Sequence, residues 1–377
     1  MLMIREFLEG DGPDTAAAAA FLKEHRSPLV EGTSVTFLFE GDVDEVHLRH
    51  FIMGFPGSQS FQRIDGTELW YLTMEVPEGS RIEYKLEIVA GKSRRLILDP
   101  LNEGTARDPF GKNSVCYGAG YDRPDWTVHD PEARPGTLRT VTVHSDIYDS
   151  DVELRVYMPA RMRQTRRYPL VIAFDGEDYL KYSALQTVLD NLIHRYEIPP
   201  MMVALSQSPN RFADYTASAE HARFVAEELL PGLKAQLPVL DDPASIGLMG
   251  ASLGAVASFW TAWRYPKLFG NLLLQSGSFR FNDTGYEEHH PALGDVVEFV
   301  NAYRQDPRRV ANRVFVTCGR YESLIWDNRA LAPHLQRSGM RVSYEEARDG
   351  HNWENWRDRL RGGLSWLFPG PLGLVYE

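Results

Sequence analysis

The chain has 377 residues, a formal net charge of −12 and a hydrophobic content of 43%, which indicate a globular protein of two domains or of one large domain with an extension. The acidic balance, without an offsetting basic stripe, argues against a nucleic-acid partner, and no apolar run is long enough to predict a membrane-spanning helix. The chain starts without the pattern of a secretion signal, and its two cysteines, Cys116 and Cys318, lie far apart. We therefore expect a cytoplasmic protein with no disulfide framework and no zinc site.

The first third of the chain predicts a helix followed by an all-β domain. Residues 14–25 contain five consecutive alanines, and Asp14 or Thr15 is expected to cap this helix. Short segments of roughly alternating polarity then follow, separated by turn residues, at 35–39, 46–52, 69–76 and 81–88. We predict an immunoglobulin-like β-sandwich domain over residues 1–117 that ends in loops at 99–102 and 108–109. Residues 118–136, rich in Asp, Pro and Gly, predict a linker.

From residue 137 onward, predicted strands alternate with predicted helices. This alternation is typical of an α/β domain in which helices cover both faces of a mostly parallel sheet, so we predict an α/β-hydrolase domain over residues 137–377. Pro231 is expected to kink or end the second of its helices. The strands are expected at 137–143, 152–158, 168–174, 201–205, 245–249, 271–275, 313–317 and 341–347. The helices are expected at 182–195, 218–237, 255–264, 295–303, 327–338 and 352–367.

One Gly-x-Ser-x-Gly motif lies between a predicted strand and a predicted helix. It covers residues 250–254 and has Ser252 at its centre. A tight turn from strand to helix at such a motif holds a serine hydroxyl clear of the sheet, as catalysis by a nucleophilic serine requires. Ser252 is therefore the predicted nucleophile. The N–H of Leu253, at the start of the helix, is expected to donate to the oxyanion that forms during acyl transfer.

A serine hydroxyl is a weak nucleophile unless a base lies beside it. In α/β-hydrolases the base is a histidine that follows the last strand. His351 occupies that position, whereas His289 and His290 lie in a Pro- and Gly-flanked loop that is better interpreted as a surface or lid segment.

The acid that orients the histidine is expected in the loop after the strand at 313–317. Glu322 is the preferred candidate, and an ion pair of this residue with Arg320 is the structural alternative. Asp327 is the second candidate, although its position suggests the N-cap of the next helix. A second oxyanion donor is expected in the loop 175–179, preferably the N–H of Glu177.

The sequence resembles the enterochelin (enterobactin) esterase family, within the wider group of esterase-D and feruloyl-esterase-like hydrolases. The loop 319–324 is similar to the place where that group keeps its acid, which supports Glu322, and Arg211 with Asp214 is similar to an Arg-x-x-Glu element. The resemblance also covers the first half, where the family has a sandwich before its hydrolase domain. The similar segments are 27–30, 35–37, 62–71, 99–102, 174–177, 228–231, 250–254, 265–270, 275–278 and 349–351.

The resemblance implies hydrolysis of an ester in a small molecule, such as the cyclic trilactone of a ferric catecholate siderophore. Because such siderophores are strongly anionic, Arg211, Arg280 and Arg320 are candidate substrate-binding residues, although each is also interpretable as a solvated surface charge. The chemistry of a serine esterase needs no cofactor and no metal. Two alternatives stay open: a feruloyl, acetyl or general carboxylesterase, and a non-catalytic ligand- or carbohydrate-binding protein with a vestigial hydrolase domain.

Overall fold

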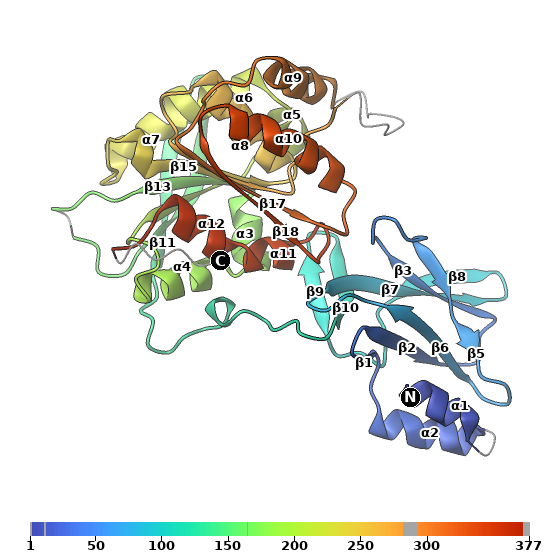
Figure 1. The fold of residues 1–377 in the computed structure, drawn as a ribbon. Coiled ribbons are helices and arrows are strands. Elements are labelled where there is room, and N and C mark those ends of the chain that lie inside the picture. The colour runs from blue at the N-terminus through green and yellow to red at the C-terminus, as the bar shows by residue number, and fades with distance from the viewer. Residues whose placement is uncertain (1, 11–12, 164, 282–292, 372–377) are drawn as a thin grey trace. The chain divides into compact units, whose positions relative to one another are not determined.

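The chain divides into two compact units (Figure 1). The computed structural model describes residues 2–10, 13–163, 165–281 and 293–371. The first unit contains Met1–Asp122 together with two short segments from much later in the chain, Gly319–Glu322 and Ala347–Asn352. The second contains Arg123–Cys318, Ser323–Glu346 and Trp353–Glu377. The predicted domain limits at 117 and 137 stay predictions.

The first unit begins with two helices, α1 (Met3–Glu9) and α2 (Thr15–Glu24). Asp14 caps α2 by accepting a hydrogen bond from the N–H of Ala17, as predicted. Two sheets follow. One has the order β1 (Leu29–Glu31), β2 (Ser34–Glu40), β6 (Leu69–Glu75), β5 (Gln62–Arg63). The other has the order β4 (Ser58–Ser60), β3 (Glu45–His50), β7 (Arg81–Ala90), β10 (Gly111–Tyr117), β9 (Thr105–Asp108), with β8 (Ser93–Ile97) also paired to β7.

The two sheets of the first unit pack face to face. Phe37 and Trp70 from one sheet share a buried cluster with Leu48 and Leu86 from the other. The predicted all-β sandwich is therefore present, while its immunoglobulin-like strand order stays a prediction.

The sandwich does not end in loops alone, as was expected for the segments at 99–102 and 108–109. Residues beyond the loop at 99–102 form β9 and β10, which extend the second sheet. The strand β8 was not predicted because its residues are exposed or half-buried, so its sequence lacks the alternation of polar and apolar side chains that indicates a strand.

The second unit is built on one mixed eight-stranded sheet. The first strands are antiparallel to their neighbours, and the strands from β14 to β17 in the sheet run parallel. The predicted α/β class is thus confirmed. The order is β11 (Thr137–Ser145), β12 (Ser150–Met158), β14 (Met202–Ser206), β13 (Leu170–Phe174), β15 (Ile246–Ala251), β16 (Asn271–Gln275), β17 (Arg313–Gly319), β18 (Arg341–Ala347).

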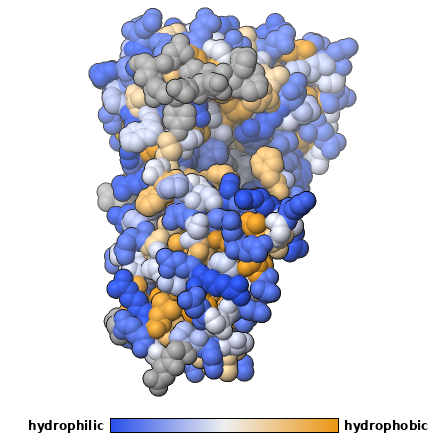
Figure 2. Space-filling model, turned by 90° about the vertical axis from the view of Figure 1, so that its right-hand side faces the viewer, coloured by the Kyte–Doolittle hydropathy of each residue, from blue (hydrophilic) through white to orange (hydrophobic). Residues whose placement is uncertain are grey.

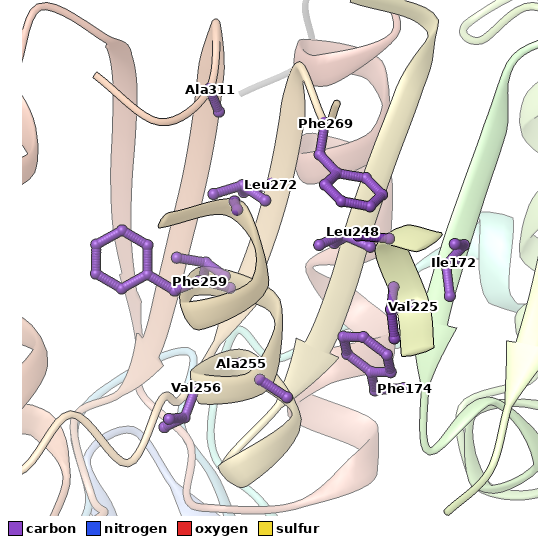
Figure 3. Close-up of a cluster of buried hydrophobic side chains, with 14 of the residues drawn as sticks. Ile172, Phe174, Val225, Leu248, Ala255, Val256, Phe259, Phe269, Leu272 and Ala311 are labelled. Carbon is purple, nitrogen blue, oxygen red and sulfur yellow. The ribbon is translucent and has the colours of Figure 1, made fainter. Parts of the chain in front are cut away.

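Both faces of this sheet are buried. In β13, Ile172 and Phe174 belong to one apolar cluster, whereas Val171 and Ala173 belong to another. Successive side chains of a strand point to opposite faces, so each cluster covers one face. Figure 3 shows the first cluster, in which Phe259 of the helix α8 (Leu253–Arg264) lies over the sheet.

The helices of the first face are α5 (Arg211–Tyr215), α6 (Ala219–Arg223), α7 (Leu230–Gln236), α8, α9 (Gly294–Gln305) and α10 (Ile325–Arg337), and those of the second are α3 (Gly176–Tyr182), α4 (Leu185–His194), α11 (Trp353–Asp358) and α12 (Leu360–Leu367).

One predicted loop and two predicted helices differ from the observed elements. The loop expected at 175–179 is mostly the helix α3, and the helix expected at 352–367 is divided into α11 and α12. The helix expected at 218–237 is interrupted by a π-helical segment, Phe224–Leu229, and Pro231 then lies in the first turn of α7, where its missing N–H costs no hydrogen bond.

Figure 2 shows one face of the molecule, on which hydrophobic residues form small groups among hydrophilic ones. Among the large apolar side chains that are exposed, Phe51 and Phe110 of the first unit are 93% and 96% accessible. No helix in the described part of the chain combines the length and the hydropathy needed to cross a bilayer. Within the same residues, no group of three or more His, Cys, Asp or Glu side chains is arranged to hold a metal ion.

Candidate active site

Ser252 lies between the end of β15 and the start of α8 in a strained conformation, with φ 57° and ψ −118°. Such a backbone costs about 1–3 kcal/mol and persists only where the surrounding structure enforces it. Two hydrogen bonds do so. The N–H of Ser252 donates to the carbonyl of Gln275 at the end of β16 (2.9 Å), and the carbonyl of Ser252 accepts from the N–H of Ser278 in the segment that follows (3.3 Å).

The motif glycine at position 250 is required by this turn. A Cβ on Gly250 would lie 2.4 Å from the carbonyl carbon of Gly254, which no side chain can tolerate. The turn therefore keeps strand and helix in close contact while the side chain of Ser252 stays half-exposed. Its Oγ lies 3.3 Å from the Oγ of Ser278.

The two predicted oxyanion donors lie at the starts of two helices that follow neighbouring parallel strands. Leu253 begins α8 after β15, and Glu177 is the second residue of α3 after β13. The register of β13 and β15 pairs Ala173 with Met249, so the ends of these strands lie side by side. Among the described residues, no acceptor engages the N–H of Leu253 or of Glu177.

Gly176 is required by packing at the start of α3. A Cβ at this position would lie 2.4 Å from the Cα of Leu205. The glycine thus lets α3 pack against β14. Asp175 before it adopts a left-handed conformation (φ 56°), and the side chain of Glu177 pairs with Arg155.

The structure brings His351 and Glu322 together in the first unit. The Nδ1 atom of His351 lies 2.5 Å from Oε2 of Glu322, and the other carboxylate oxygen accepts the N–H of Gly319 (2.6 Å). The side chain of Glu322 is only 2% exposed, whereas that of His351 is 37% exposed. A buried, doubly hydrogen-bonded carboxylate therefore holds one nitrogen of a solvent-accessible imidazole.

The alternative acid, Asp327, has another partner. Its Oδ2 lies 3.2 Å from Nη1 of Arg280, and its side chain is 1% exposed. Burial raises the pKa of Asp327 to about 6, against the opposing effect of Arg280. The interpretation of Asp327 as an N-cap was wrong, because α10 begins two residues earlier and its cap position is Leu324.

Two of the three candidate substrate arginines are held by buried carboxylates. Arg211 donates from Nε to both oxygens of Asp175 (3.0 and 2.8 Å), and Arg280 pairs with Asp327. Arg320 is exposed and donates its N–H to the carbonyl of Ala347. Burial raises the pKa of Asp175, and Arg211 opposes that effect.

In the element formed by Arg211 and Asp214, Arg211 donates to Asp175, and Asp214 accepts from the hydroxyl of Ser208 (2.5 Å). His289 and His290 lie outside the described residues. Ser278 was missed as a neighbour of Ser252. The only signal for it was the Ser-Gly-Ser sequence directly after a predicted strand.

A mixed α/β sheet with a strained serine between strand and helix is the architecture of an ester hydrolase. The family described as "Putative esterase" matches residues 145–367, and the chain belongs to this family of carboxylic ester hydrolases. The family-level recognition made from the sequence is thereby confirmed.

Particular relatives agree with this family. The chain is 24% identical over 332 residues to the iron(III) enterobactin esterase of Escherichia coli strain K12, a match that covers 81% of each chain. The enterobactin esterase of Shigella flexneri, solved in the presence of enterobactin, is similar with a TM-score of 0.73 at 20% identity, over 92% of this chain and 97% of that one. A ferulic acid esterase is similar with a TM-score of 0.54 at 17% identity, over 62% of this chain and 98% of its own. These structural similarities concern the fold.

Proposed function

We propose that this chain hydrolyses esters through an acyl-enzyme on Ser252, with His351 as the base and Glu322 as the acid that orients it. The observation that carries the proposal is the strained backbone of Ser252 at the turn from β15 to α8. Strained backbone conformations cluster at active sites, where they are part of the mechanism, and this supports a catalytic use of the hydroxyl.

In the proposed reaction, Oγ of Ser252 attacks the ester carbonyl while Nε2 of His351 takes the hydroxyl proton. The N–H groups of Leu253 and Glu177 donate to the oxyanion of the tetrahedral intermediate. When the intermediate collapses, the C–O bond to the alcohol breaks and the imidazolium returns its proton to that alcohol. Water then attacks the acyl-enzyme by the same route, releasing the acid and the serine.

Glu322 acts on this cycle through the imidazole. A carboxylate at Nδ1 fixes the tautomer that leaves Nε2 as the proton acceptor, and it stabilises the imidazolium. The 2.5 Å contact between Nδ1 and Oε2 supports this role, and the pairing of Asp327 with Arg280 argues against Asp327 as the acid.

We propose a ferric catecholate siderophore trilactone as the substrate class, based on the enterobactin esterases among the relatives. Of the arginines, Arg280 is the best supported contact, since it follows Ser278 by two residues, and Ser278 contacts the proposed nucleophile. Its side chain is 19% exposed, and Asp327 fixes it in place. A feruloyl or other carboxylesterase is the second candidate, favoured by the similarity to the ferulic acid esterase.

The test is hydrolysis of p-nitrophenyl butyrate by the wild-type protein and by Ser252→Ala. The variant should lose at least about 10³-fold in kcat, because truncation of a nucleophile removes the covalent route. Ser58→Ala is the matched control, since Ser58 is an exposed serine of β4. Equal rates in wild type and Ser252→Ala would contradict the proposal and favour a non-catalytic binding protein.

The substrate class is tested separately, by comparing kcat/KM for a ferric catecholate trilactone with that for methyl ferulate. We expect the trilactone to be preferred by at least about 10²-fold, which corresponds to nearly 3 kcal/mol of differential transition-state binding. Preference for methyl ferulate would favour the second candidate.

A further inference from the structure

The two segments that carry the proposed acid and base both belong to the sandwich unit. Gly319–Glu322 begins at the last residue of β17 and Ala347–Asn352 at the last residue of β18, yet both group with the first 122 residues. Two backbone hydrogen bonds join the segments to each other: the N–H of Arg320 donates to the carbonyl of Ala347 (2.7 Å), and the N–H of Tyr321 donates to that of Asp349 (3.0 Å).

Residues of the sandwich bind this pair of segments through backbone hydrogen bonds and through the side chain of Tyr321. The N–H of Met53 donates to the carbonyl of Tyr321 (2.9 Å), and the N–H of Arg81 donates to that of Arg348 (2.9 Å). The hydroxyl of Tyr321 lies 2.5 Å from the Oγ of Ser80. Each contact lies within three residues of Glu322 or His351.

The side chain of Arg81, the first residue of β7, also binds one of these segments. Its guanidinium is 0% exposed and forms ion pairs with Asp349 (3.2 Å) and with Glu83 (2.7 Å). Nη1 also donates to Oδ1 of Asn352 at 2.9 Å. Arg81 therefore holds residue 349 and residue 352, one on each side of His351 in the chain.

Asp349 and Asn352 also form hydrogen bonds within the loop that contains His351. Oδ1 of Asp349 accepts from the N–H of Gly350 and from Nδ2 of Asn352, both at 2.7 Å. Burial raises the pKa of Asp349 to about 6, and Arg81 is the main group that opposes this shift. Without the arginine, the loop would carry a buried carboxylate with no cationic partner, which is costly.

We propose that Arg81 is a positioning residue for the reaction: by binding Asp349 and Asn352 it fixes the loop that presents His351 to Glu322. The β-sandwich is then a structural part of the catalytic apparatus. This inference rests on the proposed function. A planar guanidinium with several fixed donors suits the role, because it orients its partners where a lysine would supply only a point charge. A base displaced by about 1 Å can lower the rate by about 10²-fold.

The experiment compares Arg81→Met, Arg81→Lys and Asn352→Ala with the wild type in steady-state kinetics on p-nitrophenyl butyrate, in the full chain. We expect kcat to fall about 10²-fold in Arg81→Met and somewhat less in Arg81→Lys, with KM changed by no more than about 3-fold. Asn352→Ala keeps the ion pair and loses the hydrogen bonds of Asn352 to Arg81 and to Asp349, so about a 5-fold loss in kcat is expected. The matched control is Arg49→Met, which removes an exposed arginine of the adjacent strand β3, 3.4 Å from Glu87, and should keep wild-type kinetics.

The comparison of kcat with KM separates positioning from a general loss of stability. A displaced His351 lowers kcat per folded chain and leaves KM within about 3-fold of the wild-type value. Loss of stability alone lowers the fraction of folded chain, and kcat per folded chain then equals that of the wild type.

The outcomes distinguish this inference from the proposed function. If Ser252→Ala keeps its activity, the proposed function fails and the positioning role fails with it. If Ser252→Ala is inactive while the Arg81 variants match Arg49→Met in kcat per folded chain, the function stands and the positioning role is overturned. If Arg81→Met does not fold, Arg81→Lys and Asn352→Ala provide the test, because a wild-type kcat per folded chain in both variants would equally overturn the positioning role.

Discussion

Nδ1 of His351 and Oε2 of Glu322 are 2.5 Å apart, although 29 residues separate them in the chain. The carboxylate is buried, and its second oxygen accepts the N–H of Gly319. This arrangement leaves the imidazole one fixed orientation relative to its acid, and the first prediction follows from it.

Glu322→Gln should lower kcat by about 10²–10⁴-fold with little change in KM, because an amide at this position donates to Nδ1 and imposes the wrong tautomer on His351. Asp327→Asn serves as the comparison and should lose less than about 10-fold, since Asp327 contacts Arg280. Steady-state kinetics of both variants show whether Glu322 or Asp327 is the acid that orients His351. A larger loss in Asp327→Asn would reverse the assignment.

Gly250→Ala should destabilise the protein by at least about 1–3 kcal/mol and abolish esterase activity, because its Cβ would overlap the backbone of Gly254 at the serine turn. Urea unfolding and the ester assay measure the two effects. Gly294→Ala is the matched control, since a Cβ there has nothing within 4 Å. Equal unfolding midpoints for the two variants would show that the turn tolerates a side chain.

Glu177→Ala tests whether Glu177 contributes to catalysis through its backbone N–H or through its side chain. The side chain pairs with Arg155, so its removal should change kcat by less than about 3-fold while the N–H stays in place. A loss comparable to the 10²–10³-fold effect typical of an oxyanion donor would show instead that the carboxylate takes part.

The pH dependence of the free energy of unfolding should show the effect of the buried carboxyl group of Asp327. Its pKa is about 6 in the folded protein and near 4 when unfolded, so the folded state binds more protons between these values and loses stability as pH rises through that range. Because of this group, the free energy of unfolding of the wild type should fall by about 1 kcal/mol between pH 5 and pH 7.5. Asp327→Asn should lack this decrease. Urea unfolding of both proteins at the two pH values measures the difference, and parallel changes would contradict it.

The central strands and the serine turn were predictable because their signals are local. The strands β13 to β17 are short apolar runs buried on both faces, which the sequence displays directly. The helix α3 was not predicted, because its first residues, Gly176, Glu177 and Asp178, have the composition of a turn. Its packing against Leu205 decides the outcome, and no local pattern encodes that contact.

In the candidate site, too, some residues have a signal in the sequence and others depend on tertiary contacts. The order of serine, acid and histidine along an α/β chain was enough to propose Ser252 and His351 and to offer Glu322 or Asp327 as the acid, and these roles stay predictions. Arg81 could not be selected in this way, because it lies 268 residues before its partner Asp349. Only the folded sandwich brings the two together, and a lone arginine at the start of a strand carries no sign of such a role.

The central claim is that Ser252 is a nucleophile activated by His351, and covalent labelling tests it most directly. Incubation with diethyl p-nitrophenyl phosphate followed by peptide mass spectrometry should find one diethylphosphoryl group per chain, on the peptide that contains Ser252. The labelling rate should fall by at least about 10²-fold in His351→Ala, since the general base is lost. Labelling of a different residue, or an unchanged rate in His351→Ala, would contradict the claim.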